Sequence, residues 1–181
     1  MTDLQTGFRV APQTKKAIRQ IAANARSALG LPAGRVNWAA FLEKLHSYGI
    51  VVDIFEASSA PVGQGIEACW IPESNTLYIQ DAVYADAVRG GARATFTIAH
   101  ELGHILLAHR RTINRAQESS PMAIWENSEW QANTFAAEFA MPLTSIRSTS
   151  LCTATQIASY FGVSLQAAEV RLRKLRADGE I

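Results

Sequence analysis

The feature that most constrains this chain is the motif His100-Glu101-x-x-His104, which is set in an apolar surround. Residues four apart lie on nearly the same face of a helix, because a helix has about 3.6 residues per turn. Ile98 and Leu102 fall on the opposite side, so the pattern predicts a helix with one polar and one core-facing side. Gly103 lacks a Cβ atom, which predicts that another segment approaches closely there.

Two imidazoles on one helix face are a typical clamp for a metal ion. The motif predicts that His100 and His104 bind Zn²⁺ as neutral imidazoles. Glu101 is then expected to take a proton from a zinc-bound water, because the metal lowers the pKa of that water to about 7.

A zinc site of this kind needs a third protein ligand. The metzincin pattern has a glycine three residues and a histidine six residues after the second histidine, but Leu107 and Arg110 stand there, which excludes that class. A thermolysin-like site instead takes a glutamate from a second helix downstream. Residues 128–141 read as such a helix, stopped by Pro142.

Glu129 and Asn133 share a face of this second helix, because they are four residues apart. We therefore predict that Glu129 is the third metal ligand and that Asn133 supports a metal ligand without itself binding the metal. Glu138 lies about 180° away from Glu129 on the helical wheel and is expected to face elsewhere. The alternatives that the sequence leaves open for the third ligand are Glu126, Glu118 and His109, although His109 is interpreted first as a buried or capping histidine.

These two blocks resemble the ImmA/IrrE metallopeptidases. The matching residues are 96–104, the pattern Glu129-x-x-Ala132-Asn133-x-Phe135-Ala136-Ala137-Glu138, and Met141-Pro142. The resemblance implies a small zinc-endopeptidase-like domain in which one Zn²⁺ per chain is held by His100, His104 and Glu129, with Glu101 as the catalytic residue. The family commonly carries a glutamate where this chain has Gln131, a departure that leaves the assigned ligands in place.

The remaining sequence predicts an α+β fold, a zincin-like small domain that is mainly helical with a three-stranded, partly antiparallel sheet. Before the zinc helix, the periodicity and turn residues predict an arm or frayed end over 1–12, helices over 13–29 and 37–45, strands over 50–55, 66–71 and 76–80, and a link over 81–91. The exposed edge of such a sheet could hold an extended substrate by backbone hydrogen bonds, or the strands could serve only the core.

The C-terminal residues predict a helix-turn-helix-like segment, with one helix before Gly162 and a second over 165–176. We predict a metallopeptidase-like domain over 1–148 and this segment over 149–181, packed on the first. Four cations on the second helix could contact phosphates: Arg171, Arg173, Lys174 and Arg176. DNA binding is nevertheless not favoured, because three nearby acidic residues, Glu169, Asp178 and Glu180, nearly cancel that charge.

The bulk properties are those of a globular protein. The chain has 181 residues, of which 48% are hydrophobic and 18% charged, and its net charge is +1. Cys69 and Cys152 show no disulfide or zinc spacing and are interpreted as two buried thiols in a reducing compartment. The sequence shows no signal peptide and no membrane-spanning stretch, so we expect a cytoplasmic location and no membrane partner.

The leading hypothesis is therefore a zinc metalloendopeptidase. The resemblance implies that its substrate is a helix-turn-helix repressor encoded nearby, so that cleavage derepresses a mobile-element or stress-response operon. The alternative is a non-catalytic, zinc-stabilised regulatory or toxin-antitoxin component that binds a partner protein or DNA, and a third reading is a hydrolase of small amides or peptides. Glu101 argues against the alternative, because a structural zinc site needs no base. The open candidates for an oxyanion stabiliser are Tyr48, Tyr78, Tyr84, Tyr160 and His46.

Overall fold

The structure is a computed structural model that describes all residues except 1–6, 60, 62, 64 and 111–120. The predicted α+β fold is confirmed. The strands are β1 (Val51–Phe55), β2 (Ala68–Ile71) and β3 (Thr76–Gln80). The helices are α1 (Lys15–Ala28), α2 (Trp38–Leu45), α3 (Asp81–Val88), α4 (Ala92–Leu106), α5 (Ser128–Ala140), α6 (Leu143–Ser148), α7 (Ala154–Phe161) and α8 (Leu165–Ala177), with 3-10 turns η1 (His46–Tyr48) and η2 (Ile124–Glu126).

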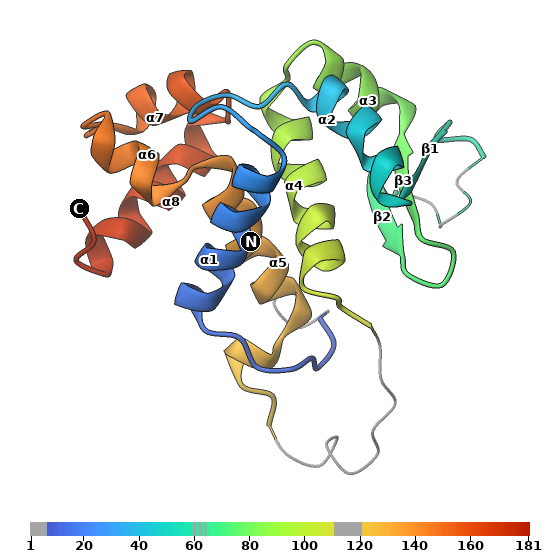
Figure 1. Cartoon of the computed structure of the whole chain (residues 1–181), viewed down its shortest axis with the longest axis horizontal. Helices are drawn as coiled ribbons and strands as arrows, with labels where there is room; N and C mark the ends of the chain where they lie inside the picture. The colour runs from blue at the N-terminus through green and yellow to red at the C-terminus, as the bar shows by residue number, and fades with distance from the viewer. Residues whose placement is uncertain (1–6, 60, 62, 64, 111–120) are drawn as a thin grey trace.

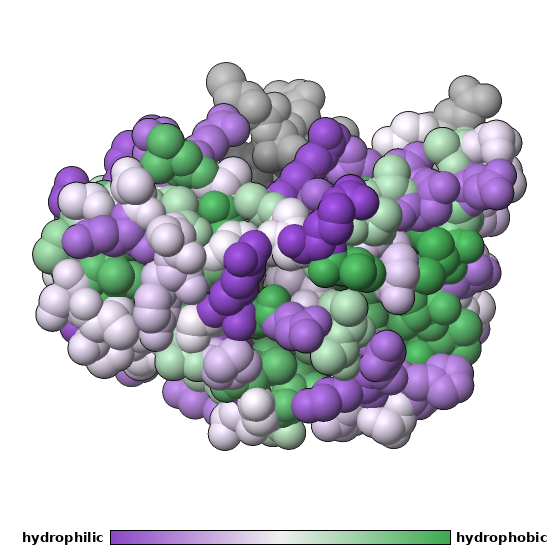
Figure 2. Space-filling view, turned by 90° about the horizontal axis from the view of Figure 1, so that it is seen from above, coloured by the Kyte–Doolittle hydropathy of each residue, from purple (hydrophilic) through white to green (hydrophobic). Residues whose placement is uncertain are grey.

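The three strands form a mixed sheet in the order β1-β3-β2. β1 runs parallel to the central strand and β2 antiparallel to it, so the sheet is partly antiparallel, as predicted. Leu77 and Ile79 of β3 are fully buried in the main core, whereas Val51 and Ile54 of the outer strand β1 remain exposed. Figure 2 shows hydrophobic residues gathered toward the side of the molecule where Figure 1 places the sheet. The opposite edge strand, β2, borders α4.

Helices α4 and α5 pack against each other at the centre of the molecule, with α1 on the other side of α5 (Figure 1). The two helices come close together at Gly103, where an added Cβ would lie 3.0 Å from Cα and 3.1 Å from the carbonyl oxygen of Ala132. The predicted close approach at this glycine is confirmed. A larger side chain would push α5 away from α4, so Gly103 sets the spacing between the two helices that carry the predicted ligands.

Two local predictions are wrong. The segment 81–91, predicted as a link, contains helix α3. The sequence gives no sign of its start, because the N-cap residue Gln80 makes no side-chain capping bond. The prediction of a frayed end over 1–12 is wrong for the described part, which is an anchored arm: the N–H of Phe8 donates to Oγ of Ser128 at 3.1 Å, and the N–H of Val10 donates to the carbonyl oxygen of Glu126 at 2.8 Å. This segment therefore docks on the start of α5.

The C-terminal helices α6 to α8 surround a second hydrophobic cluster, which begins at Ala140, before the predicted domain boundary. Helices α7 and α8 are joined by a turn at Gly162, whose positive φ of 68° favours glycine. The expectation that Arg171 offers its charge to phosphates is wrong. Its guanidinium is buried and pairs with the carboxylate of Glu138 at 2.7 and 2.9 Å, because Glu138 faces away from the predicted metal ligands.

Glu138 lies at the centre of a buried network of ion pairs. Its carboxylate also accepts two hydrogen bonds from Arg19 of α1, both at 3.0 Å, so it ties α1 and α8 to α5. Burial alone would raise the pKa of Glu138, but the hydrogen bonds and charges of Arg171 and Arg19 lower it. Because the folded-state pKa is lowered, this contribution to stability is present above the unfolded-state pKa of about 4.3 and is lost as pH falls through the folded-state pKa.

We expect Glu138→Gln to lower the free energy of unfolding at pH 7 by about 3 to 5 kcal/mol, because two arginines lose their buried counter-charge. Urea denaturation of the variant and the wild type, repeated at falling pH, measures the loss and shows a smaller acid dependence for the variant. Glu180→Gln is the control, since Glu180 also pairs with Arg19 but is more exposed. Equal losses of unfolding free energy in the two variants would contradict the central role of Glu138 in this network.

Both cysteines are free thiols, but neither is fully buried as expected: Cys69 is half-buried and Cys152 exposed. Cys152 lies in the linker before α7, and Cys69 lies on β2 beside α4. Among the described residues, no helix has both the length and the apolar character that crossing a bilayer requires.

Candidate metal centre

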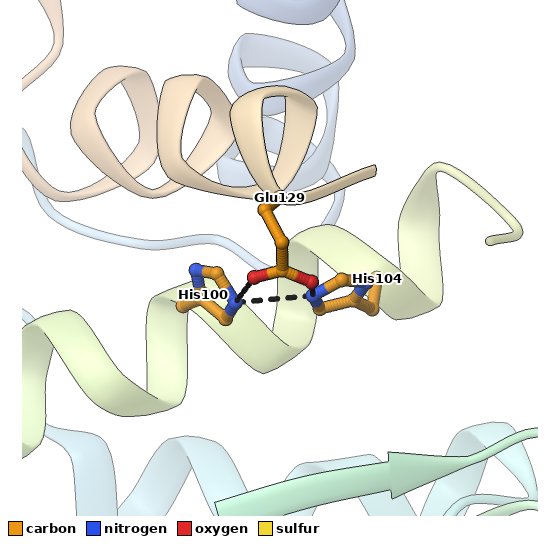
Figure 3. Close-up of side chains that lie close together, drawn as sticks. All are labelled: His100, His104 and Glu129. Atoms are coloured by element: carbon orange, nitrogen blue, oxygen red, sulfur yellow. Dashed lines mark hydrogen bonds and ion pairs between the residues drawn. The ribbon is translucent and has the colours of Figure 1, made fainter. Parts of the chain in front are cut away.

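Helices α4 and α5 bring His100, His104 and Glu129 together (Figure 3). The Nε2 atoms of the two histidines are 3.0 Å apart. Glu129 reaches down from the first turn of α5, with Oε2 3.1 Å from Nε2 of His100 and Oε1 3.4 Å from Nε2 of His104. The three donor groups thus converge on one point between the helices.

The spacing of these donors fits a tetrahedral metal ion. In a tetrahedral site with metal–ligand bonds of about 2.0 to 2.1 Å, neighbouring donor atoms lie about 3.3 Å apart. The two Nε2 atoms are 3.0 Å apart, and they lie 3.1 and 3.4 Å from the two different carboxylate oxygens of Glu129, separations that are close to that value. Among the described residues no fourth side chain joins this group, and two imidazoles with one carboxylate are a donor set that zinc accepts in catalytic sites.

The charges at the centre also suit a cation. Burial and the neighbouring His100 lower the pKa of His104, which favours a neutral ring. The hydrogen bond from His100 lowers the pKa of Glu129, which keeps its carboxylate ionised. Although burial alone would lower the pKa of His100, the hydrogen bond with Glu129 and the charge of Glu101 raise it. A negative centre of this kind attracts either a proton or a metal ion.

Asn133, predicted to support a metal ligand, contacts His100. Oδ1 of Asn133, one turn after Glu129 on α5, lies 3.1 Å from Nδ1 of His100. When Nδ1 carries the ring proton and donates it to this oxygen, the lone pair of Nε2 points toward Glu129 and His104.

Glu101 lies on the same helix as the histidines, beside the sheet. Its Oε2 accepts a hydrogen bond of 2.9 Å from the backbone N–H of Trp70 on β2. Burial raises the pKa of Glu101 to about 7, so a proton can be gained or released near neutral pH. A general base needs this property, and the bond from β2 holds the side chain in one orientation.

The centre opens onto a cleft of about 340 Å³ between α4, β2 and the start of α5. The cleft is lined by Phe8, Cys69, Trp70, Pro72, Glu73, His100, Glu101, His104, His109 and Glu129. None of the five candidate oxyanion stabilisers is among these described lining residues. Cys69 and Trp70 lie on β2, one of the strands whose edge was considered for substrate binding, whereas Phe8 comes from a segment that the motif analysis did not connect with the site.

Neither of the two rival ligands that the structure describes joins the donor group. Glu126 accepts a hydrogen bond from the N–H of Ala123 at 3.0 Å and pairs with Arg9 at 3.5 Å, so its carboxylate is engaged at η2. Glu118 lies outside the described residues. His109 lies behind His104, where burial lowers its pKa, and its Nδ1 is 2.9 Å from Nδ1 of His104. Its other ring nitrogen contacts Gln131, a pairing across 22 residues that no local pattern in the sequence signals.

Comparisons with known proteins agree with this description. Residues 91–173 match the model of a peptidase family described as the IrrE N-terminal-like domain, which confirms the resemblance over that range. A solved structure of a Mycobacterium tuberculosis transcriptional regulator matches with a TM-score of 0.57 and 17% identity over 85% of this chain, which concerns the fold alone. The chain spans about half of that regulator, covering 46% of it. No curated protein matches the sequence.

Proposed function

From the match of residues 91–173 to the IrrE N-terminal-like peptidase family, we propose that this chain is a zinc-dependent endopeptidase that cleaves a protein substrate. The observation that carries the proposal is the convergence of His100, His104 and Glu129 on one point, with Glu101 beside it in an open cleft. The family match supports a metallopeptidase-type role.

In this proposal Nε2 of His100, Nε2 of His104 and the carboxylate of Glu129 hold one zinc ion. Two nitrogen donors and one oxygen donor are a set that zinc accepts in catalytic sites. When bound, the ion supplies Lewis acidity, which polarises a carbonyl group and makes water a stronger acid. Asn133 orients His100 through its Nδ1 atom.

Glu101 acts as the general base. One of its carboxylate oxygens is held by the N–H of Trp70, and the group accepts a proton from the attacking water. The same carboxyl group then donates that proton to the nitrogen of the leaving amine, because a peptide amine leaves only when protonated. A pKa near neutrality suits both steps.

The cleft is compatible with an extended polypeptide. β2 is an edge strand of the sheet, and Cys69 and Trp70 on it line the cleft beside Glu101. A substrate segment that pairs with the remaining backbone groups of this edge would lie in the same cleft as the donor groups, since the N–H of Trp70 is already donated to Glu101. This geometry favours a protein substrate over a small amide, because the cleft is bordered by a strand edge.

We further propose that the substrate is a helix-turn-helix repressor encoded nearby, and that its cleavage in the cytoplasm derepresses a mobile-element or stress-response operon. The support for this substrate is the family resemblance. Direct DNA binding is not favoured, because Arg171 is buried against Glu138 and Arg176 donates to the carbonyl oxygen of Cys152.

Removal and restoration of zinc tests this function. The protein is stripped with a chelator, reloaded with one equivalent of Zn²⁺, and incubated with the repressors encoded near its gene. We expect cleavage of one repressor at a defined bond, loss of cleavage after stripping, and recovery with about one zinc per chain, measured by mass spectrometry and elemental analysis. If one zinc binds but no repressor is cleaved, the non-catalytic regulatory component becomes the better description.

A further inference from the structure

A buried hydrogen-bond chain runs from the back of His104 into the protein. Nδ1 of His104 lies 2.9 Å from Nδ1 of His109, and Nε2 of His109 lies 2.9 Å from Oε1 of Gln131. Both His109 and Gln131 are almost fully buried. This hydrogen-bond chain therefore connects a proposed metal ligand with the interior through two polar residues that do not belong to the donor group.

The far end of this chain fixes the direction of its hydrogen bonds. Nε2 of Gln131 lies 2.8 Å from the carbonyl oxygen of Ala11 and 2.7 Å from that of Trp125. Carbonyl oxygens only accept hydrogen bonds, so the donating NH₂ group of Gln131 must face them. The amide oxygen of Gln131 therefore faces His109, and it too only accepts.

The orientation of the Gln131 amide determines which ring nitrogen carries the proton, first in His109 and then in His104. Nε2 of His109 must carry a proton, because it donates to the amide oxygen of Gln131. A neutral imidazole has one N–H group, so Nδ1 of His109 accepts, and Nδ1 of His104 must be the donor. A doubly protonated His109 would reverse the last bond, but neither of its two hydrogen-bond partners carries a negative charge to stabilise a buried cation.

We propose that Gln131 and His109 are positioning residues that hold His104 in the tautomer whose Nε2 lone pair faces the metal position. The proposal rests on the metal site of the proposed function and deepens it. Asn133 has the same relation to His100, so each histidine receives a polar partner that α5 places directly or through one intermediate. The segment before α1 takes part as well, since Ala11 supplies one of the two oxygens that orient Gln131.

The first test needs no substitution. Nitrogen-15 NMR of the histidine rings in the metal-free protein distinguishes a protonated from an unprotonated ring nitrogen. We expect His104 and His109 to be different tautomers, with the proton on Nδ1 in His104 and on Nε2 in His109. A proton on Nε2 of His104 would overturn the proposal.

The second test measures the affinity for Zn²⁺ by competition with a chelator. In His109→Leu and Gln131→Met, which keep bulk but remove the polar atoms, we expect roughly 10- to 100-fold weaker binding and a mixture of His104 tautomers. In His109→Asn, the amide oxygen can still accept from Nδ1 of His104, so we expect binding and tautomer to return toward those of the wild type.

Thermal unfolding separates positioning from a purely structural role. A structural role predicts that the three variants lose zinc affinity only in proportion to their loss of stability, without rescue by asparagine, and that result would overturn the proposal. The wild type separates this inference from the proposed function: a wild type without zinc affinity contradicts the metal site itself. A wild type that binds zinc no better than His109→Leu contradicts only the role of the hydrogen-bond chain.

Discussion

Replacing Glu101 with glutamine is expected to lower the rate of substrate cleavage by roughly 10²- to 10⁴-fold while leaving one zinc ion bound per chain. Glutamine has nearly the same shape as glutamate, and its amide oxygen can still accept the hydrogen bond from Trp70. It cannot take a proton from water, so the variant loses the base and keeps the site. The rate is measured as kcat/KM on the cleaved repressor, and the metal content by elemental analysis.

The matched control for this variant is Glu43→Gln, the same substitution at an exposed position of α2 far from the cleft lining. It should cleave and bind zinc as the wild type does. A Glu101→Gln protein that cleaves at the wild-type rate would contradict the role of Glu101. A simultaneous loss of zinc would instead indicate that the carboxylate of Glu101 contributes to metal binding.

The parts of the site that the sequence predicted are those set by helical periodicity. His100 and His104 had to share a face of α4, and Glu129 and Asn133 had to share a face of α5, because each pair is four residues apart. Gly103 indicated a close approach, and α5 is the segment that approaches. Local spacing predicted these contacts, while the choice of Glu129 over Glu126 also drew on the thermolysin-like pattern.

The parts that the sequence did not predict depend on contacts between distant segments. Gln131 and His109 are 22 residues apart and meet only because α4 and α5 pack antiparallel around Gly103. Arg171 was predicted to be an available cation, because its counter-charge, Glu138, lies 33 residues earlier in the sequence. The anchoring of residues 8–10 on the start of α5 is likewise a contact over more than a hundred residues.

The same difference between local spacing and contacts of distant segments explains why helix α3 was not predicted. Its sequence follows β3 without a side-chain cap, and only Val83 and Ala87 bury a face. A single turn of apolar spacing does not distinguish a helix from a connecting segment. Helix α3 packs against α4 beside the sheet, so packing decides a conformation that the local pattern left open.

Replacing Glu129 with alanine is expected to lower the affinity for zinc by more than the roughly 10- to 100-fold loss typical of a residue that only supports a ligand. The substitution removes one of three donors, and it also removes the negative charge that offsets the charge of the ion. Because the Glu129 side chain is about one-third exposed, the fold should tolerate the change. Competition with a chelator measures the affinity, and circular dichroism checks the fold.

Glu126→Ala distinguishes Glu129 from its nearest rival. Glu126 pairs with Arg9 and the N–H of Ala123 at η2, so its removal should weaken the anchoring of the N-terminal segment without lowering the zinc content. If Glu129→Ala kept its zinc and Glu126→Ala lost it, the assignment of the third ligand would be wrong and η2 would have to move toward α4 when metal binds. Loss of zinc in Glu129→Ala alone would instead mean that α5 completes the site from its first turn, which makes the spacing set at Gly103 a requirement for metal binding as well as for packing.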